Sequence, residues 1–147
     1  MGSNQVPISL LHRSIESNGV LETARRLGVT LIAHSPLAGR MLTGKFHADR
    51  RLVDSMPRLR RLTGYNAKRL DRIAGLMAAL RDIATQHTAT ITQIALAWLT
   101  SFYGETVVAI PGASKPHHAD EAAVAMHVTL TTGELQRLAD LSSPPTR

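Results

Sequence analysis

Polar side chains follow two short apolar runs of this chain, at the point where each run ends. A His-Ser pair comes directly after the run at 29–33, and a Ser-Lys pair follows the run at 107–110 after a Pro-Gly-Ala turn. Proteins built from alternating strands and helices bind their ligands at the carboxyl ends of buried parallel strands. Two such ends in 147 residues therefore predict a ligand site.

The second of these ends favours an anion. Pro116 suits the first turn of a helix, so Lys115, His117 and His118 gather at the amino terminus of that helix. Cations there oppose the helix dipole, which is understandable if an anion binds between them. A solvated loop is the alternative interpretation. No metal is expected at the two histidines, because neighbouring helical residues point about 100° apart and no third ligand is suitably spaced.

Alternating strand and helix patterns must position these residues. Strands are predicted at 4–9, 29–33 and 106–110, the first being an edge strand because it contains Pro7. Helices are predicted after Asn18 (ending at Gly28), from Ala67 to about His87, after the capping boxes that begin at Thr90 and Thr131, and at 116–126. This order predicts a parallel sheet with right-handed crossovers.

The predicted sheet is incomplete. Three parallel strands are too few to close a barrel, which takes about eight. They leave open edges and one poorly covered apolar face, so the chain is expected to be part of something larger. Residues 35–66 have no clean period and several Pro and Gly residues, which predicts a long loop over a site. Pro144-Pro145 predicts a frayed tail.

Composition narrows the class of protein. Hydrophobic residues make up 44% and charged residues 19%, as in a globular chain, and there is no cysteine. No apolar run approaches the ~18 residues of a membrane span, and the opening Met-Gly-Ser-Asn-Gln does not resemble a signal peptide. A cytoplasmic protein without membrane contact is therefore predicted.

The basic residues are unevenly distributed. Ten of the 17 lie between Arg40 and Arg72, and this cluster could bind a polyanion. Nucleic acid is not expected as a partner, because binding of single strands uses stacking on aromatic side chains and the chain has only five.

Five segments in order resemble the aldo-keto reductase family, a group of (β/α)8-barrel enzymes that reduce aldehydes and ketones with NADPH. They are Asn4-Gln5-Val, Ser9-Leu-Leu-His-Arg, Gly28-Val-Thr-Leu-Ile-Ala-His-Ser-Pro-Leu-Ala, Leu42-Thr-Gly-Lys and Ile110-Pro-Gly-Ala-Ser. The resemblance implies an α/β fold whose parallel (β/α) units form the C-terminal part of a TIM (β/α)8 barrel, incomplete in this chain. Residues 1–147 would supply about strands 6–8 with their helices, and 35–66 a loop on the cofactor and substrate side.

The resemblance also implies a set of NADPH-binding residues. Gln5 would bind the nicotinamide carboxamide, and His34 stands where the family usually has an aromatic residue stacked on the nicotinamide ring. Small residues after His34 would line the pyrophosphate, and Ser114, Lys115 and His118 would hold the 2′-phosphate. The complete set is Gln5, His34, Ser35, Pro36, Leu37, Ala38, Gly39, Leu42, Lys45, Ile110, Pro111, Gly112, Ala113, Ser114, Lys115, His118 and Glu121.

Besides His34, two positions depart from the family pattern, His118 and Ala122. His118 replaces an Arg, so phosphate binding there is expected to be weaker and pH-dependent. Glu121 matches a family acid near the adenine, but Ala122 stands where many members have an adenine-contacting Asn.

No catalytic residue is predicted in this chain. Carbonyl reduction needs a positioned acid, which in the family is a Tyr tuned by Lys and Asp, with a His that orients the carbonyl. No segment matches those motifs, and Tyr65 and Tyr103 lie elsewhere. The resemblance implies NADPH as the cofactor and a small carbonyl compound as the substrate, but the isolated chain is predicted to have negligible reductase activity. It would self-associate or pair with a missing N-terminal half. Alternatives are a non-catalytic nucleotide-binding or regulatory module and a basic polyanion-binding protein.

Overall fold

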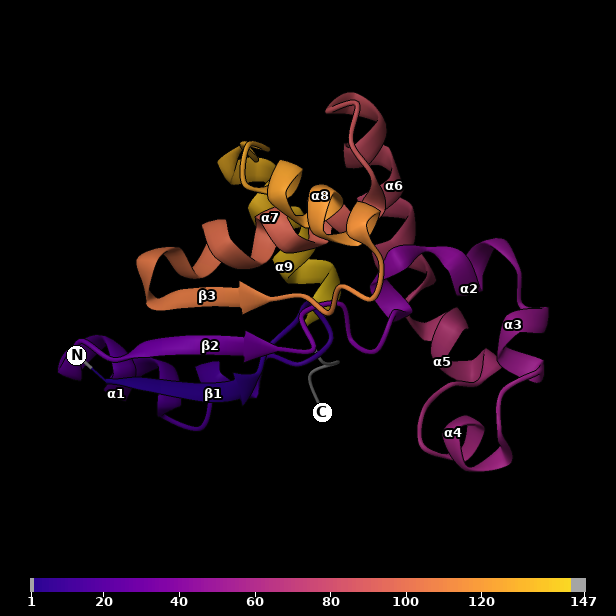
Figure 1. The fold of residues 1–147 in the computed structure, drawn as a ribbon, viewed down its shortest axis with the longest axis horizontal. Coiled ribbons are helices and arrows are strands. Elements are labelled where there is room, and N and C mark those ends of the chain that lie inside the picture. Colours follow the sequence, from indigo (N-terminus) through magenta and orange to yellow (C-terminus); the bar gives the residue numbers. More distant parts are fainter. Residues whose placement is uncertain (1, 144–147) are drawn as a thin grey trace.

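The computed structural model describes residues 2–143 and is built on a three-stranded parallel sheet (Figure 1). The strands are β1 (Ser3–Pro7), β2 (Thr30–His34) and β3 (Val107–Ile110), in this spatial order. Gln5 of β1 lies opposite Ile32 of β2, which in turn lies opposite Val108 of β3. The parallel α/β architecture predicted from the sequence is therefore confirmed, and the three strands end at a common edge of the sheet.

Helices connect the strands and cover one side of the sheet. Their bounds are α1 (Val20–Leu27), α2 (Lys45–Ala48), α3 (Arg51–Asp54), α4 (Arg58–Leu62), α5 (Ala67–Arg72), α6 (Ala74–Gln86), α7 (Ile91–Tyr103), α8 (Pro116–Ala125) and α9 (Thr132–Ser142), with short 3-10 turns η1 (Ser14–Glu16), η2 (Met41–Thr43) and η3 (Gly104–Thr106).

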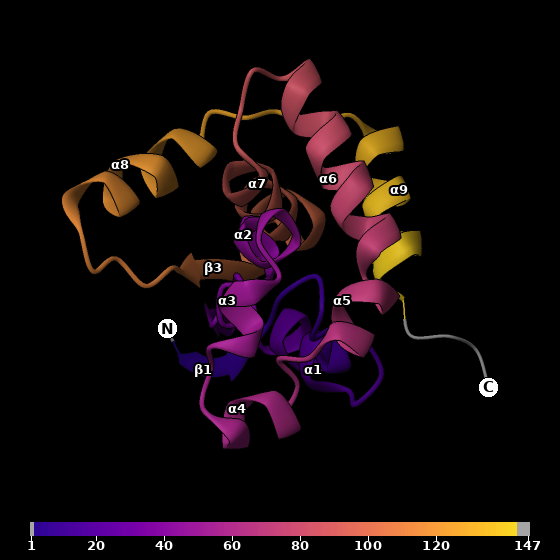
Figure 2. The same ribbon diagram turned by 90° about the vertical axis from the view of Figure 1, so that its right-hand side faces the viewer.

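Helix α7 is the centre of the apolar core. It packs against β3, α6, α8 and α9, and Figure 2 shows α6 and α9 side by side. Trp98 of α7 is fully buried and stacks on Phe102 with the ring centroids 4.6 Å apart. Its indole Nε1 donates a hydrogen bond to the carbonyl oxygen of Leu135 on α9 at 3.0 Å, so the one polar atom of this side chain is satisfied.

Local signals in the sequence set several helix ends as predicted. Gly28 has a left-handed backbone, with φ 64°, and ends α1. Both predicted capping boxes are present: Thr90 accepts from the N–H of Gln93, and Thr131 accepts from the N–H of Glu134. The strands differ from their predicted bounds by one or two residues at their ends. The predicted frayed tail at Pro144-Pro145 lies outside the described residues.

Two predictions about the middle of the chain are wrong. The single helix expected at 67–87 is broken at Ile73, which has φ −96° and ψ 5° and separates α5 from α6. A β-branched residue followed closely by Gly75 has poor helix propensity, and the buried face continues on both sides of the break. Residues 35–66, predicted as a loop, contain η2, α2, α3 and α4 instead. Each of these helices is about one turn long, too short for a helical period to be visible in the sequence.

One face of the sheet is covered and the other is not. Leu31 and Ala33 of β2 are buried against the helices. Ile32 points to the opposite face together with Val108 and Ile110 of β3, which remain 50% and 44% exposed. The predicted poorly covered apolar face is therefore present. Within residues 2–143, no helix is both long enough and apolar enough to cross a bilayer.

Candidate functional site

The loop that leaves β2 has a strained backbone. Ser35, Ala38 and Arg40 have φ values of 54°, 49° and 75°, although none of them is glycine, and Gly39 has φ 61°. A left-handed backbone costs an L-residue about 1 kcal/mol, and such strain concentrates at functional sites. The positive φ of Ser35 is followed by the negative φ of Pro36, which is the alternation of an anion-binding backbone nest, whereas Ala38, Gly39 and Arg40 form a consecutive left-handed run. We call Ser35–Arg40 the nest loop.

Several N–H groups of the nest loop are open to a ligand. The loop is closed by bonds from Ala38 N to Ser35 O at 2.9 Å and from Leu42 N to Leu37 O at 3.2 Å. Within residues 2–143, the N–H groups of Leu37, Gly39 and Arg40 have no acceptor. A backbone N–H without a partner is costly unless water or a ligand accepts from it. The nest loop is therefore suited to several oxygen atoms of an anion.

The loop that leaves β3 supplies a second group of cations, at the start of α8. Helix α8 begins with Pro116 at its first turn, as predicted, and the preceding Lys115 is extended and exposed. The hydroxyl of Ser114 lies 3.4 Å from Nδ1 of His118, and the rings of His117 and His118 are 4.3 Å apart. These side chains come together at the amino terminus of a ten-residue helix, where the backbone dipole also favours an anion.

The pKa of His118 is lowered by desolvation and by charges from two segments of the chain. Partial desolvation lowers this pKa, and so do the charges of His117, Lys45 and Lys115, whereas Glu121 raises it. Lys45 belongs to α2, which follows the nest loop, while the other groups belong to the start of α8. Cations from both strand exits therefore act on the same imidazole.

Gln5 and His34 lie apart from this cluster, on the uncovered face of the sheet. His34 is opposite Pro7 and Ile110, two residues beyond the row that contains Gln5, so the two side chains share a face. Gln5 is exposed, and Nδ1 of His34 lies 3.4 Å from the hydroxyl of Ser35. Both side chains are accessible from the open side of the sheet.

Three predicted site residues are placed differently from the others. Leu42 is fully buried, and its N–H bonds to Leu37 within the loop, so Leu42 supports the nest loop from the core. Pro36 is also buried. The carboxylate of Glu121 accepts a 2.6 Å hydrogen bond from the hydroxyl of Thr90, which ties α8 to the start of α7. The predicted residues at 110–115 lie on the exposed exit of β3.

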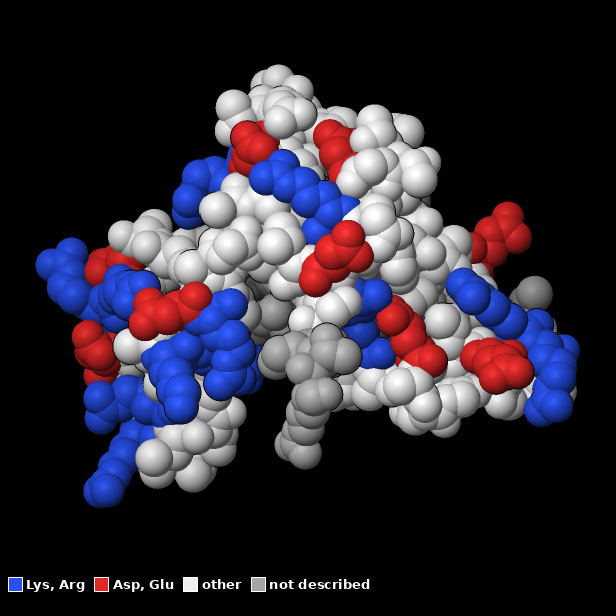
Figure 3. All heavy atoms as spheres, turned by 180° about the vertical axis from the view of Figure 1, so that it is seen from behind, with Lys and Arg blue, Asp and Glu red and all other residues white. Residues whose placement is uncertain are grey.

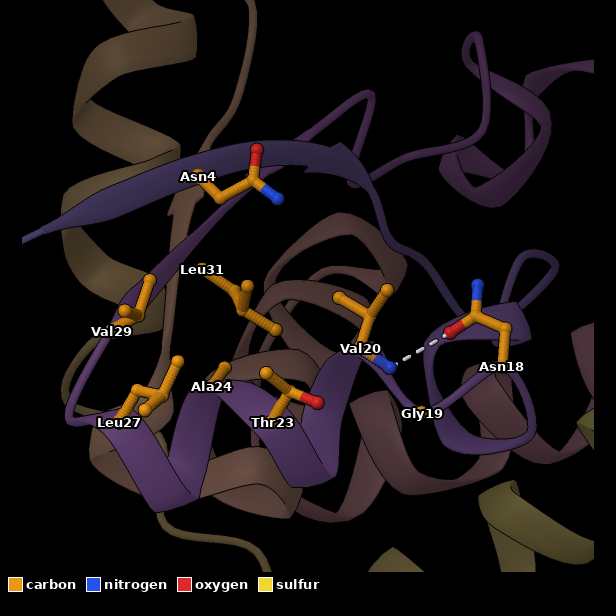
Figure 4. Close-up of a pocket in the computed structure, with 9 residues that line it drawn as sticks. All are labelled: Asn4, Asn18, Gly19, Val20, Thr23, Ala24, Leu27, Val29 and Leu31. Atoms are coloured by element: carbon orange, nitrogen blue, oxygen red, sulfur yellow. Dashed lines mark hydrogen bonds between the residues drawn. The ribbon is translucent and has the colours of Figure 1, made fainter.

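Two grooves lie at the free edges of the sheet. One, of about 280 Å³, runs between β1 and α1, with Asn4, Leu27 and Val29 among its lining residues (Figure 4). The other, of about 350 Å³, lies between β3 and α8. Their linings are mostly apolar and hold none of the cations of the site. They mark places where the sheet lacks a neighbouring strand and helix.

Tyr65 and Arg40 belong to this site and were not predicted for it. The hydroxyl of Tyr65 donates to the carbonyl oxygen of Gly39 at 2.8 Å, across 26 residues of sequence. Arg40 contributes a left-handed backbone and an open N–H. Neither role has a local signal, because Tyr65 stands in an unpatterned segment and arginine has no preference for positive φ.

Comparison with known proteins identifies the family of this chain. The model of the aldo/keto reductase family matches residues 1–143, and the chain belongs to this family. It is 34% identical over 129 residues to the aldo-keto reductase str7 of Strobilurus tenacellus, covering 86% of this chain and 38% of that protein. It is 38% identical over 140 residues to an uncharacterized oxidoreductase of Mycobacterium tuberculosis, covering 94% of this chain and 41% of that protein.

Solved structures confirm that the fold is part of a TIM barrel. A thermostable aldo-keto reductase in complex with the inhibitor epalrestat matches with a TM-score of 0.65 and 31% identity, over 95% of this chain and 39% of that one. An aldo/keto reductase from Klebsiella pneumoniae in complex with NADP and acetate matches with a TM-score of 0.65 and 26% identity, over 99% of this chain and 41% of that one. The chain thus spans about two fifths of the relatives it matches.

Proposed function

We propose that this chain is the NADPH-binding portion of an aldo-keto reductase that reduces aldehydes or ketones. The observation that carries the proposal is the meeting of an N–H-rich nest loop and a cationic helix start at the exits of two neighbouring parallel strands. Relatives with NADP or NADPH in their solved structures support the same ligand.

Each part of the site fits a different part of this cofactor. The nest loop, followed by Lys45, suits the pyrophosphate, because it offers N–H groups without an acceptor and a cation. Ser114, Lys115 and His118 suit the 2′-phosphate, the group that distinguishes NADPH from NADH. When bound, the cofactor would supply a hydride.

The uncovered face of the sheet fits the remaining end of the ligand. Gln5 offers an amide donor and acceptor to a carboxamide, and the ring of His34 offers a flat surface for stacking. Glu121 remains our proposed neighbour of the adenine, although its carboxylate already accepts a hydrogen bond from Thr90.

Proton donation to the substrate is assigned to polypeptide outside this chain. Both tyrosine hydroxyls are already used within the fold: Tyr65 donates to Gly39, and Tyr103 donates to Glu16 at 2.5 Å. Burial, together with the hydrogen bond to Glu16, raises the pKa of Tyr103 and makes it a poor acid catalyst at neutral pH. We expect this chain alone to consume no NADPH with reactive aldehydes.

Calorimetry with the full chain tests the proposal. NADPH, NADH and 2′-AMP are titrated into the wild type and into the Lys115→Gln/His118→Gln double variant at pH 6. We expect the variant to bind NADPH and 2′-AMP about tenfold more weakly, since the charge-assisted contact of Lys115 and a hydrogen bond of His118 are lost, and NADH equally well. Lys68→Gln, a change of the same type on α5, serves as the control. Absence of binding of both NADPH and 2′-AMP to the wild type contradicts the proposal.

A second candidate function, polyanion binding, is favoured by the charge of α4. Figure 3 shows Lys and Arg gathered on the part of the molecule formed by α2–α5, and Arg58, Arg60 and Arg61 are all exposed. Salt-sensitive retention of the chain on heparin that NADPH does not change, and that Arg58→Gln/Arg60→Gln/Arg61→Gln abolishes, would support this function. Retention that NADPH competes away assigns the charge to the cofactor site instead.

A further inference from the structure

We propose that Tyr65 is a positioning residue for the nest loop, and that its hydrogen bond to Gly39 couples anion binding to the order of the segment 41–66. This inference rests on the proposed function, because it concerns how the same loop receives the pyrophosphate. It gives a role to the whole segment between β2 and α5, because Tyr65 near the end of this segment contacts the nest loop at its beginning.

Tyr65 is itself held in a fixed orientation. Its ring packs edge-on against Phe46 of α2, with the centroids 5.9 Å apart and the planes at 80°. Phe46 is only 3% exposed, so it is anchored in the core. The backbone N–H of Tyr65 donates to the carbonyl oxygen of Arg60 at 3.0 Å, which fixes the chain just after α4. The hydroxyl therefore reaches Gly39 from a side chain that is fixed at both its ring and its backbone.

The contact requires a glycine at position 39. A Cβ atom built on Gly39 would lie 1.9 Å from the hydroxyl oxygen of Tyr65, and the φ of 61° is itself unfavourable for other residues. Tyr65 thus packs directly over the bare α-carbon of the nest loop. This close approach explains why the loop needs a glycine at the position that Tyr65 covers.

The hydrogen bond sets the direction of an anion-binding group. In a planar trans peptide, the carbonyl of one residue and the N–H of the next point in opposite directions. When Tyr65 holds the carbonyl oxygen of Gly39, it directs the N–H of Arg40 to the other side, where this N–H has no acceptor within residues 2–143. The carbonyl of Arg40 is held in turn by the hydroxyl of Thr43 at 2.8 Å. Both peptide groups around the strained Arg40 are therefore fixed.

Coupling in both directions follows from this arrangement. An anion that accepts from the N–H of Arg40 polarises the same peptide group that accepts from Tyr65, so each bond strengthens the other. The coupling is reciprocal. If the hydrogen bond from Tyr65 increases the affinity for the anion, then a bound anion stabilises that hydrogen bond equally, and with it the order of Tyr65 and of the segment 41–66.

The decisive variant is Tyr65→Phe, which removes the hydroxyl and keeps the ring on Phe46. ADP-ribose, which contains the pyrophosphate, and 2′-AMP, which does not, are titrated into the full chain by calorimetry. We expect Tyr65→Phe to bind ADP-ribose about fivefold more weakly, as for the loss of one ordinary hydrogen bond, and 2′-AMP as tightly as the wild type. Tyr103→Phe is the matched control, because it also removes one hydroxyl bond but lies away from the nest loop, and it should leave both affinities unchanged.

Trypsin provides a readout that a purely structural role would not change. Arg58, Arg60 and Arg61 are exposed on α4, within the coupled segment. ADP-ribose should slow cleavage there in the wild type and in Tyr103→Phe, and should slow it less in Tyr65→Phe at equal occupancy, whereas 2′-AMP should not slow it in any of them.

The outcomes separate the two proposals. Equal ADP-ribose affinity in Tyr65→Phe and the wild type overturns the positioning role while leaving the cofactor site intact. An equal loss for ADP-ribose and 2′-AMP also overturns it, because the effect is then not confined to the nest loop. If the wild type binds neither ligand, the proposed function fails first and this inference fails with it.

Discussion

At the scale of single residues, Arg13 connects more of the fold than any side chain of the candidate site. Its guanidinium donates to both carboxylate oxygens of Glu16, at 2.9 and 3.0 Å, and to the carbonyl oxygen of Ala139 at 2.6 Å. It also lies over the ring of Trp98, 5.4 Å from the centroid. One planar group thus joins the segment after β1 to α7 and α9, which a lysine could not do.

We expect Arg13→Leu to lower the free energy of unfolding by about 1–2 kcal/mol, because it removes the bonds of a largely buried guanidinium and leaves the partly exposed Glu16 without its cationic partner. The side chain of Arg13 is 11% exposed, whereas that of Arg51, paired with Asp49, is 90% exposed. Arg51→Leu is therefore the control, with an effect below about 0.5 kcal/mol. Urea denaturation measures both variants, and equal losses would contradict the role given to Arg13.

Glu16 makes part of the stability depend on pH. Desolvation acts to raise the pKa of this carboxyl, but hydrogen bonds from Arg13 and Tyr103 outweigh it and lower the pKa below the ordinary 4.5. The folded state therefore binds the proton less readily than the unfolded state does. The contribution is complete above about pH 4.5 and is lost as the pH falls through the folded pKa.

Denaturation curves between pH 3 and pH 7 test this dependence. Glu16→Gln should be less stable than the wild type at pH 7, and this difference should shrink toward pH 3. Glu22→Gln, at an exposed position of α1, should follow the wild type throughout. If the difference in unfolding free energy between Glu16→Gln and the wild type is constant across this range, the charge of the carboxylate does not stabilise the fold.

At the scale of elements, the two capping boxes differ in how many helices they connect. Thr131 caps α9 alone, whereas the hydroxyl of Thr90 caps α7 and also donates to Glu121 of α8. Thr131→Ala should cost about 1 kcal/mol of unfolding free energy, the usual value of an N-cap. Thr90→Ala should cost more, by about a further 1 kcal/mol for the bond to a charged group. Thr90→Ser keeps the hydroxyl and should restore most of the loss in a denaturant titration, and equal costs of the two alanine variants would show that the bond to Glu121 contributes nothing.

The elements that could be predicted from the sequence are those whose signals are local. The capping boxes and Gly28 depend on residues three or four positions apart, and the three strands on short apolar runs. The break at Ile73 could not be predicted, because the apolar period continues through it. The same limit applies to the site. Its cations are visible as charges beside Pro116, but the nest loop depends on positive φ at Ser35 and Ala38, residue types that give no sign of it, and on a tyrosine 26 residues away.

At the scale of the whole molecule, the uncovered face and the two edge grooves all mark places where the sheet lacks further neighbours. The edges of β1 and β3 have no neighbouring strand within residues 2–143, and each has an apolar groove beside it. Relatives of this chain are more than twice its length. We therefore propose that further (β/α) units of a barrel cover the open face and edges of the sheet, and that copies of the chain without them cover the open face by self-association.

Val108 is the residue on which self-association can be tested. It lies in the middle of β3 on the uncovered face and is 50% exposed, whereas Val124 on α8 is 49% exposed and lies off that face. A lysine at 108 would have to be desolvated in any contact made by the sheet face, so Val108→Lys should weaken self-association about tenfold or more. Val124→Lys adds the same charge at an equally exposed valine and should leave it unchanged. Sedimentation velocity over a range of concentrations measures both variants. If Val124→Lys dissociates the chain as effectively as Val108→Lys, net charge rather than the sheet face governs the assembly. If the wild type is monomeric at every concentration, the open face does not drive self-association of this chain.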